Sequence, residues 1–262
     1  MGLYIAGRAS GGMGGRLIAG VLLDYISWQT ATSIIGALNL LIAITFYMAL
    51  PASKHFKAYP INLNRFIESF KKNLADVRLR LLFAEGFILM GCFVTVFNYM
   101  SYHLLEKPFE LSQMWIGLIS IAYLSGIYSS PRAASWSHKF GRDNVLIAML
   151  SMMIFGLWIM LIPTLWAILA GLLIFTFSFF AAHSTSSSWV SVQSLQYRAV
   201  GSSLYLFCYY LGSSFLGSSG GLVWEQGGWF GLTIAITLVL IIGVFIAFKL
   251  KQIQIQEKLK MN

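Results

Sequence analysis

Polar side chains are scarce in this sequence, and a few of them stand inside long apolar stretches. Arg16 occupies the middle of one such stretch, so it could bind a substrate, take part in proton coupling, or pair with helix ends. Asn98 and Tyr102 are four residues apart and share one face of a helix, so they face either a cavity or a neighbouring helix. Tyr123 and Tyr209 could stack on an aromatic or cationic substrate, or pack between helices. These five residues are the candidates for a substrate cavity.

A hydroxyl-rich run at 184–188 follows His183, which raises the question of a Ser/His nucleophile. Such a nucleophile needs an orienting acid and an oxyanion site, and no G-x-S-x-G sequence surrounds these residues. We therefore expect His183 to lie at a solvated helix end. No spacing of His, Asp and Glu resembles a metal site, and Cys92 and Cys208 lie inside apolar stretches. The sequence predicts neither an enzyme nor a protein with a metal or another cofactor.

The elements that position these residues must be membrane helices. The chain has 262 residues, of which 58% are hydrophobic and 10% charged, whereas soluble domains carry about 25% charged residues. This composition excludes an ordinary soluble enzyme, a disordered protein and a nucleic-acid binder. The apolar stretches are apolar all round and long enough to cross a bilayer as helices, and we expect every proline at or between their ends. The eight predicted spans are Gly2–Leu23, Trp28–Leu50, Leu81–Leu104, Met114–Ser130, Val145–Ile162, Thr164–Ala182, Ser202–Trp224 and Gly228–Phe248.

The positive charges predict the orientation. Of the 18 Lys and Arg residues, 15 lie in the linker 51–80, the alternate loops 131–144 and 183–201, or the tail 249–262, and only Lys107 lies in the other set of loops. Lys and Arg are enriched in cytoplasmic loops. We therefore expect a multi-pass membrane protein with both termini in the cytoplasm and no cleavable signal.

A basic linker divides the chain unequally. Phe66, Phe70, Leu74 and Val77 recur at helical spacing, which predicts an amphipathic helix at 62–76 on the cytoplasmic face. The expected organisation is a pair of helices at 1–50, the linker at 51–80, a six-helix bundle at 81–250 and a cytoplasmic tail at 251–262.

An internal repeat accounts for this unequal division. A shift of 201 residues aligns Tyr4 with Tyr205, and Trp28 with Trp229, and it also aligns glycines of the first and seventh spans. Parallel six-helix repeats are a known transporter construction. If the seventh span is the fifth of its half, the first span is also a fifth, and we expect four helices of that half to be missing from this chain.

Glycines are the second feature of these two spans. In the first span, glycines spaced four residues apart let two helix backbones approach closely. The glycines that we expect to pack helices are Gly7, Gly11, Gly15, Gly20, Gly212 and Gly221.

Three stretches give the chain a family resemblance. Residues 129–142 resemble the signature loop of the major facilitator superfamily: Lys139, Gly141 and Arg142 match, whereas His138 replaces an acid and Ala134 a glycine. The glycine-rich stretch 7–20 resembles the fifth helix of its antiporters, without their Gly-Pro pair. Residues 198–214 resemble the eleventh helix of its bacterial twelve-helix efflux permeases.

The resemblance covers nearly the whole chain and implies a fold and a function. The fold would be an all-α integral membrane protein whose eight transmembrane helices correspond to helices 5–12 of the twelve-helix arrangement. The function would be secondary transport across the bacterial inner membrane, with proton-coupled efflux (antiport) of small molecules by alternating access. The partners would be the lipid bilayer, a small-molecule substrate and H+, with no nucleic acid and no cofactor. The alternative is a truncated, non-transporting permease remnant or assembly partner.

Overall fold

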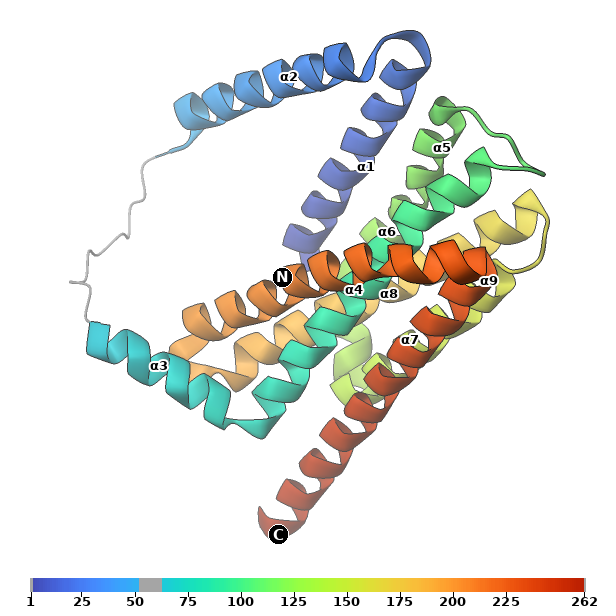
Figure 1. The fold of residues 1–262 in the computed structure, drawn as a ribbon. Helices are drawn as coiled ribbons and strands as arrows, with labels where there is room; N and C mark the ends of the chain where they lie inside the picture. Colours follow the sequence, from blue (N-terminus) through green and yellow to red (C-terminus); the bar gives the residue numbers. More distant parts are fainter. Residues whose placement is uncertain (1, 52–62, 262) are drawn as a thin grey trace.

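The computed structural model describes residues 2–51 and 63–261, and every regular element in these two ranges is a helix (Figure 1). The all-α membrane fold expected from the sequence is confirmed. The α-helices are α1 (Gly2–Tyr25), α2 (Trp28–Ala49), α3 (Leu63–Ala75), α4 (Val77–Leu105), α5 (Gln113–Ile119), α6 (Tyr123–Phe140), α7 (Arg142–Ile159), α8 (Leu165–Gln193) and α9 (Arg198–Met261). Two 3-10 turns, η1 (Ser120–Ala122) and η2 (Leu195–Tyr197), join α5 to α6 and α8 to α9.

Gly228 divides α9 into two arms. Its φ of 54° and ψ of −150° are not helical, and the chain turns back there into a second arm that diverges from the first (Figure 1). Five helices are long and apolar enough to cross a membrane, namely α2, α4, α7, α8 and α9. With α9 counted as two arms, and with α1 and the α5–η1–α6 segment included, the described chain has one helical segment for each of the eight predicted spans.

Two predicted loops turn out to be helical. In the structure α6 continues through Pro131 to Phe140, and α8 continues to Gln193, so the expectation that every proline lies at or between span ends is wrong. Hydropathy detects the apolar band of a helix and not its polar ends. The serines there form hydrogen bonds inside the bundle: Ser184 Oγ donates to the Ser130 carbonyl at 2.9 Å. The polar ends are therefore accommodated without loops.

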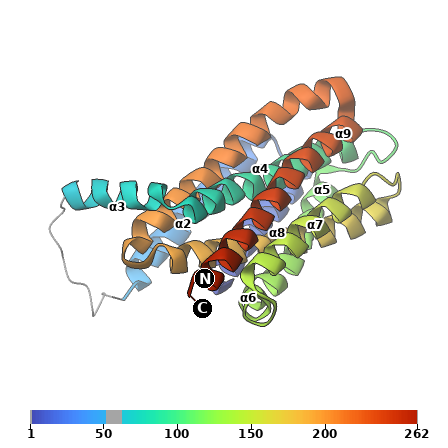
Figure 2. The same cartoon turned by 90° about the horizontal axis from the view of Figure 1, so that it is seen from below.

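The six-helix set from α4 to α9 forms the packed body of the molecule. Its long helices run roughly along one direction (Figure 2), with α4 against α9 and both α6 and α7 against α8. Backbones touch where α7 meets α8, since a Cβ on Gly156 would lie 2.7 Å from the Gly171 carbonyl oxygen. Leu82, Leu146 and Phe175 are fully buried in the core between these helices.

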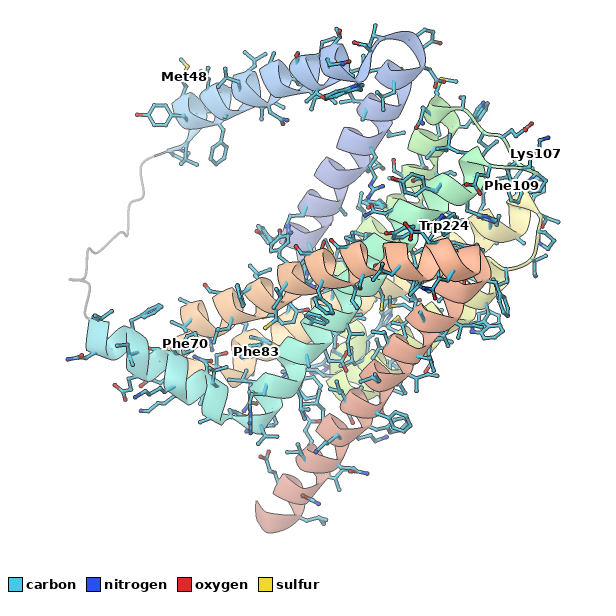
Figure 3. The ribbon with its side chains drawn as sticks, viewed as in Figure 1. Met48, Phe70, Phe83, Lys107, Phe109 and Trp224 are labelled. Atoms are coloured by element: carbon cyan, nitrogen blue, oxygen red, sulfur yellow. The ribbon has the colours of Figure 1, made fainter. Side chains whose placement is uncertain are left out.

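The two N-terminal helices differ in their contacts. In the structure α1 packs along α5 and α6, whereas α2 extends away from the body and contacts mainly α1. Ala31 is the buried residue of α2, and the Met48 side chain projects from its far end (Figure 3). The apolar surface of α2 is suited to lipid or to another helix.

Residues 52–62 of the linker fall outside the described ranges. The helix α3, which follows them, lies across one end of the body. Its polar side faces the protein, where Asn73 is buried, while Phe66 and Phe70 are exposed. Asp76 caps α4 by accepting from the Arg78 and Leu79 amides, and it also accepts from Gln193 Nε2 at 2.7 Å. Beside Tyr197, the ammonium of Lys72 lies 2.7 Å from Glu68 and lowers the pKa of that carboxyl.

Candidate functional site

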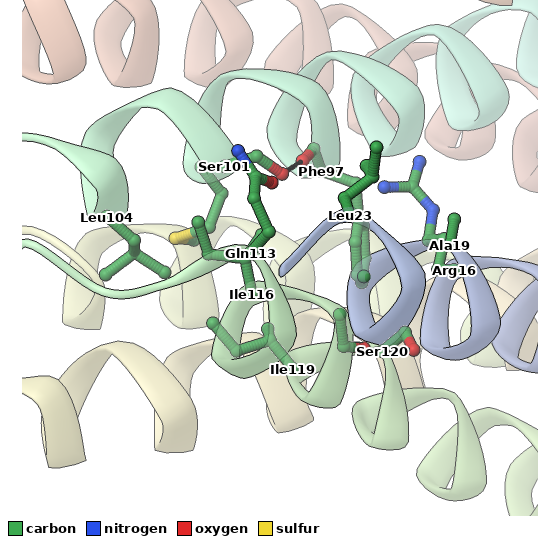
Figure 4. A pocket seen from close by; sticks show the side chains of 13 residues that line it. Arg16, Ala19, Leu23, Phe97, Ser101, Leu104, Gln113, Ile116, Ile119 and Ser120 are labelled. Atoms are coloured by element: carbon green, nitrogen blue, oxygen red, sulfur yellow. Dashed lines mark hydrogen bonds between the residues drawn. The ribbon is translucent and has the colours of Figure 1, made fainter. Parts of the chain in front are cut away.

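Two cavities lie where α1 meets the six-helix set. The first, which we call the Arg16 cavity, is bounded by α1, α4, α5 and η1 (Figure 4), is open on one side and has a volume of about 150 Å³. Its lining consists of Arg16, Ala19, Gly20, Leu23, Phe97, Met100, Ser101, Leu104, Gln113, Ile116, Gly117, Ile119 and Ser120.

Close backbone contact positions Arg16 at this cavity. A Cβ on Gly20 would lie 2.8 Å from Gly117 Cα, so α1 and α5 touch one turn beyond Arg16. The Arg16 guanidinium carbon lies 5.3 Å from the centre of the Phe97 ring on α4, within cation–π range. It also interacts electrostatically with Tyr123. Arg16 is therefore held by aromatic side chains.

The second cavity, the Arg8 cavity, lies about two turns earlier along α1, is also open on one side and has a volume of about 190 Å³. The Arg8 guanidinium donates to the Tyr210 hydroxyl and lies over the rings of Tyr209 and Tyr210, at 5.8 and 5.5 Å from their centres. The cavity is lined by Ile5, Arg8, Ala9, Gly12, Met90, Phe93, Tyr123, Phe179, Phe180, His183 and Tyr209.

Aromatic rings form the walls of the Arg8 cavity. Phe93 and Phe179 stack at 3.9 Å, and Tyr123 meets Phe180 edge-on at 5.7 Å. Tyr123 also meets Phe97 edge-on at 5.0 Å, so this pair stands between the two cavities. The arrangement offers flat apolar surfaces beside each guanidinium.

His183 is not at a solvated helix end, and that expectation is wrong. It is 2% exposed, because α8 continues ten residues beyond it. Its Nδ1 shares a hydrogen bond of 2.9 Å with the hydroxyl of Tyr205, and its ring lies 4.5 Å from that of Tyr209. Sequence reasoning missed His183 because the run of hydroxyl residues after it resembles a solvated end.

The structure separates the five predicted cavity residues. Arg16 lines one cavity, and Tyr123 and Tyr209 line the other. Asn98 and Tyr102 are exposed on α4 and line neither cavity among the described residues, and Tyr102 lies near Trp224 of α9, with 6.5 Å between ring centres.

Sequence reasoning also missed Arg8 as a cavity residue. A signal was available, since Arg8 and Arg16 are the two charged residues within the first span and are spaced eight residues apart. Eight residues are slightly more than two helical turns, so both can face the same neighbours.

The predicted packing glycines fall into two groups. A Cβ on Gly20 or Gly212 would collide with backbone, and one on Gly221 would lie 3.1 Å from the Tyr99 hydroxyl. A Cβ added to the other three would meet no described atom within 4 Å, so the structure does not place them in a helix interface. These three are Gly7, Gly11 and Gly15.

The signature-like loop is the tight turn between α6 and α7. Gly141 joins the two helices with a φ of 89°, a left-handed conformation that favours glycine. His138 and Lys139 are exposed in the last turn of α6, where positive charge is favourable, and Arg142 begins α7. Lys251 of α9 donates to Asn144 at 2.8 Å and ties the turn to the second arm.

Both cavities are basic. Neither lining contains Asp or Glu, and in the described ranges neither guanidinium lies within 4.0 Å of a carboxylate. No group of three or more His, Cys, Asp and Glu side chains comes together in the described residues to hold a metal ion. The chemistry available is therefore recognition of charge and of flat apolar groups.

Comparisons with known proteins agree with this architecture. The sequence profile of the Major Facilitator Superfamily matches residues 1–217. Similar proteins include an uncharacterized transporter of Buchnera aphidicola subsp. Acyrthosiphon pisum (strain APS), 45% identical, the inner membrane transport protein YnfM of Escherichia coli (strain K12), 44% identical, and the uncharacterized MFS-type transporter YybF of Bacillus subtilis (strain 168), 36% identical. The matches cover 98%, 95% and 94% of this chain. They cover 63%, 60% and 61% of those relatives, so the chain spans about three fifths of their length.

Proposed function

The chain belongs to the major facilitator superfamily, and from this premise we propose that it forms part of the substrate path of a secondary transporter working by alternating access. The family and the names of the relatives place the chain among membrane transporters rather than enzymes. The observation that carries the proposal is the pair of arginine-lined cavities between α1 and the six-helix set. Transporters of this construction bind substrate between two helix bundles, near the middle of the bilayer.

This proposal assigns the helices to two bundles. In it α1 and α2 are the last two helices of one bundle, α3 lies in the cytoplasmic linker, and α4 to α9 are the other bundle. The support is the contact pattern, in which α4 to α9 pack among themselves and α1 meets them mainly along α5 and α6.

We further propose proton-coupled efflux. The glycine-rich α1 resembles the fifth helix of antiporters, and two buried titratable side chains are candidates to carry the proton. His183 lines the Arg8 cavity. Glu85 of α4 is fully buried, and neither of its carboxyl oxygens has a hydrogen-bond partner among the described residues. An ionisable residue inside a membrane protein commonly marks an ion or substrate pathway.

The proposed location is the bacterial inner membrane, with both termini in the cytoplasm. The distribution of Lys and Arg supports this orientation. The name of YnfM, an inner membrane transport protein, supports the location.

The test is transport by the purified chain in liposomes. Under an imposed proton gradient, a panel of fluorescent dyes of both charges is offered, and we expect saturable dye movement that a protonophore abolishes. Arg16→Gln should reduce the rate about tenfold or more, because one charge-assisted hydrogen bond contributes roughly 1.5–3 kcal/mol. Lys107→Gln, which removes a positive charge from an exposed loop, is the matched control and should leave the rate unchanged.

The alternative proposal is a chain that does not transport alone and serves as a remnant or an assembly partner. Its support is α2, whose apolar side chains are nearly all exposed in the described structure, as those of a helix that packs on another chain would be. Absence of gradient-dependent dye movement in liposomes where the chain is folded and inserted would favour this alternative.

A further inference from the structure

We propose that the Arg8 cavity binds an organic anion with an aromatic group, and this assignment rests on the transporter function proposed above. The cavity brings together a guanidinium, an imidazole and aromatic walls, and its lining has no carboxylate among the described residues. A cationic substrate would meet only like charge there, whereas an anion would meet a partner.

The charge of Arg8 is only partly satisfied by the protein. One of its nitrogens donates to the Tyr210 hydroxyl, and its other contacts are with ring faces, including Tyr4 at 5.9 Å from the ring centre. A guanidinium has five N–H donors arranged as a planar fork that fits a carboxylate. Arg8 therefore retains donors for an anionic group.

A second arginine strengthens the selection for anions. Arg16 also lacks a carboxylate within 4.0 Å in the described residues, and it acts electrostatically on Tyr123, which lines the Arg8 cavity. Charges of the same sign in a site of low dielectric constant add to its potential. Arg8 and Arg16 therefore give both cavities beside α1 a positive potential that attracts anions.

The apolar part of the ligand is specified by the rings. Phe93, Tyr123 and Phe180 present faces and edges within one cavity of about 190 Å³ that is open on one side. A closed apolar cavity of about 150 Å³ holds a benzene ring, so this partly open cavity suits a flat aromatic group. In this arrangement the anionic group contacts Arg8, while the rings of the ligand lie against this wall.

The test uses three probes that share one ring system and differ in charge: 2-naphthoate, 2-naphthalenemethanol and 2-naphthylmethylammonium. The purified chain is placed in nanodiscs of zwitterionic lipid, and binding is measured by saturation-transfer NMR against empty nanodiscs. We expect saturable binding of naphthoate, about tenfold or more tighter than that of the neutral alcohol, and no saturable binding of the ammonium ion. Tighter binding of the ammonium ion would overturn the proposal, and this comparison requires no variant.

Variants then locate the site. Arg8→Gln should weaken naphthoate binding about tenfold or more and leave binding of the alcohol unchanged, while Arg8→Lys should give an intermediate loss. Arg132→Gln is the matched control, since Arg132 lies 3.6 Å from the Tyr128 ring centre on α6 and lines neither cavity. Naphthoate binding unaffected by Arg8→Gln in a chain of native helix content would overturn the assignment.

The binding experiment and the liposome experiment together show which of the two proposals fails, the anion site or transport by this chain. Selective naphthoate binding without gradient-dependent movement in liposomes would support the anion site and contradict transport by this chain. Movement of cationic dyes without naphthoate binding would support transport and contradict the anion site.

Discussion

At the scale of single residues, the buried pair of His183 and Tyr205 shows how polar groups are satisfied inside this membrane protein. Their side chains are 2% and 1% exposed and share a hydrogen bond of 2.9 Å. A buried polar atom that loses its partner costs about 1–3 kcal/mol. The pair therefore fixes the start of α9 against α8 beside the Arg8 cavity.

Tyr205→Phe removes the hydroxyl and leaves the His183 nitrogen without this partner. We expect the free energy of unfolding to fall by about 1–3 kcal/mol, measured by denaturant titration in lipid bicelles. The control is Tyr47→Phe on α2, because the Tyr47 side chain is 85% exposed. Equal stability of the two variants would contradict a structural role for the hydrogen bond.

At the scale of helices, glycines decide which backbones come together. A Cβ on Gly212 of α9 would lie 2.0 Å from the Phe87 carbonyl oxygen of α4, whereas one on Gly36 of α2 would meet nothing within 4 Å. The obstructing atom at Gly212 is backbone, so it cannot be moved by a change of rotamer. The contact between α4 and the first arm of α9 therefore depends on this glycine.

Gly212→Ala should destabilise the chain by about 1–3 kcal/mol or more through overpacking. Gly36→Ala should instead be neutral or stabilising by up to about 1 kcal/mol, because alanine favours the helix. Denaturant titration of both variants in the same lipid bicelles measures whether the free energy of unfolding falls or rises. A Gly212→Ala chain as stable as Gly36→Ala would show that α4 and α9 do not approach this closely.

At the scale of the whole molecule, the connections separate into two ends. The joins between α4 and α5, α7 and α8, and the two arms of α9 lie at one end (Figure 1), and α3 and the Gly141 turn lie at the other. The basic segments belong to the second end, so the proposed orientation puts it in the cytoplasm.

Single cysteines test this orientation after Cys92 and Cys208 are replaced by alanine. A cysteine at the exposed Lys107 should react with a membrane-impermeant maleimide in intact spheroplasts, and one at the exposed Lys139 should react only after the membrane is opened. Labelling of Lys139→Cys in intact spheroplasts would reverse the orientation.

Much of the fold could be predicted from the sequence because long apolar segments in a membrane can only be helices. The helical segments at the eight predicted spans follow from this rule. The helical ends around Pro131 and His183 do not, since polar residues signal a loop unless the bundle gives them partners. The site was harder to predict. The cost of a charge in a membrane singled out Arg16, but the position of Arg8 over Tyr209 depends on contacts between α1 and α9, which spacing along one helix cannot reveal.

The turn at Gly228 makes the fold depend on handedness. An unbroken α9 of 64 residues would be about 96 Å long, far longer than a bilayer is thick. The break uses a φ of 54° and a ψ of −150°, a conformation open essentially to glycine because it is the mirror image of one that L-residues adopt freely. A D-alanine at this position would therefore fit the turn, whereas its L-enantiomer, with identical atoms and hydrophobicity, would be strained. Glycine is the only achiral residue of the genetic code, and so the only one that is indifferent to this reversal of hand.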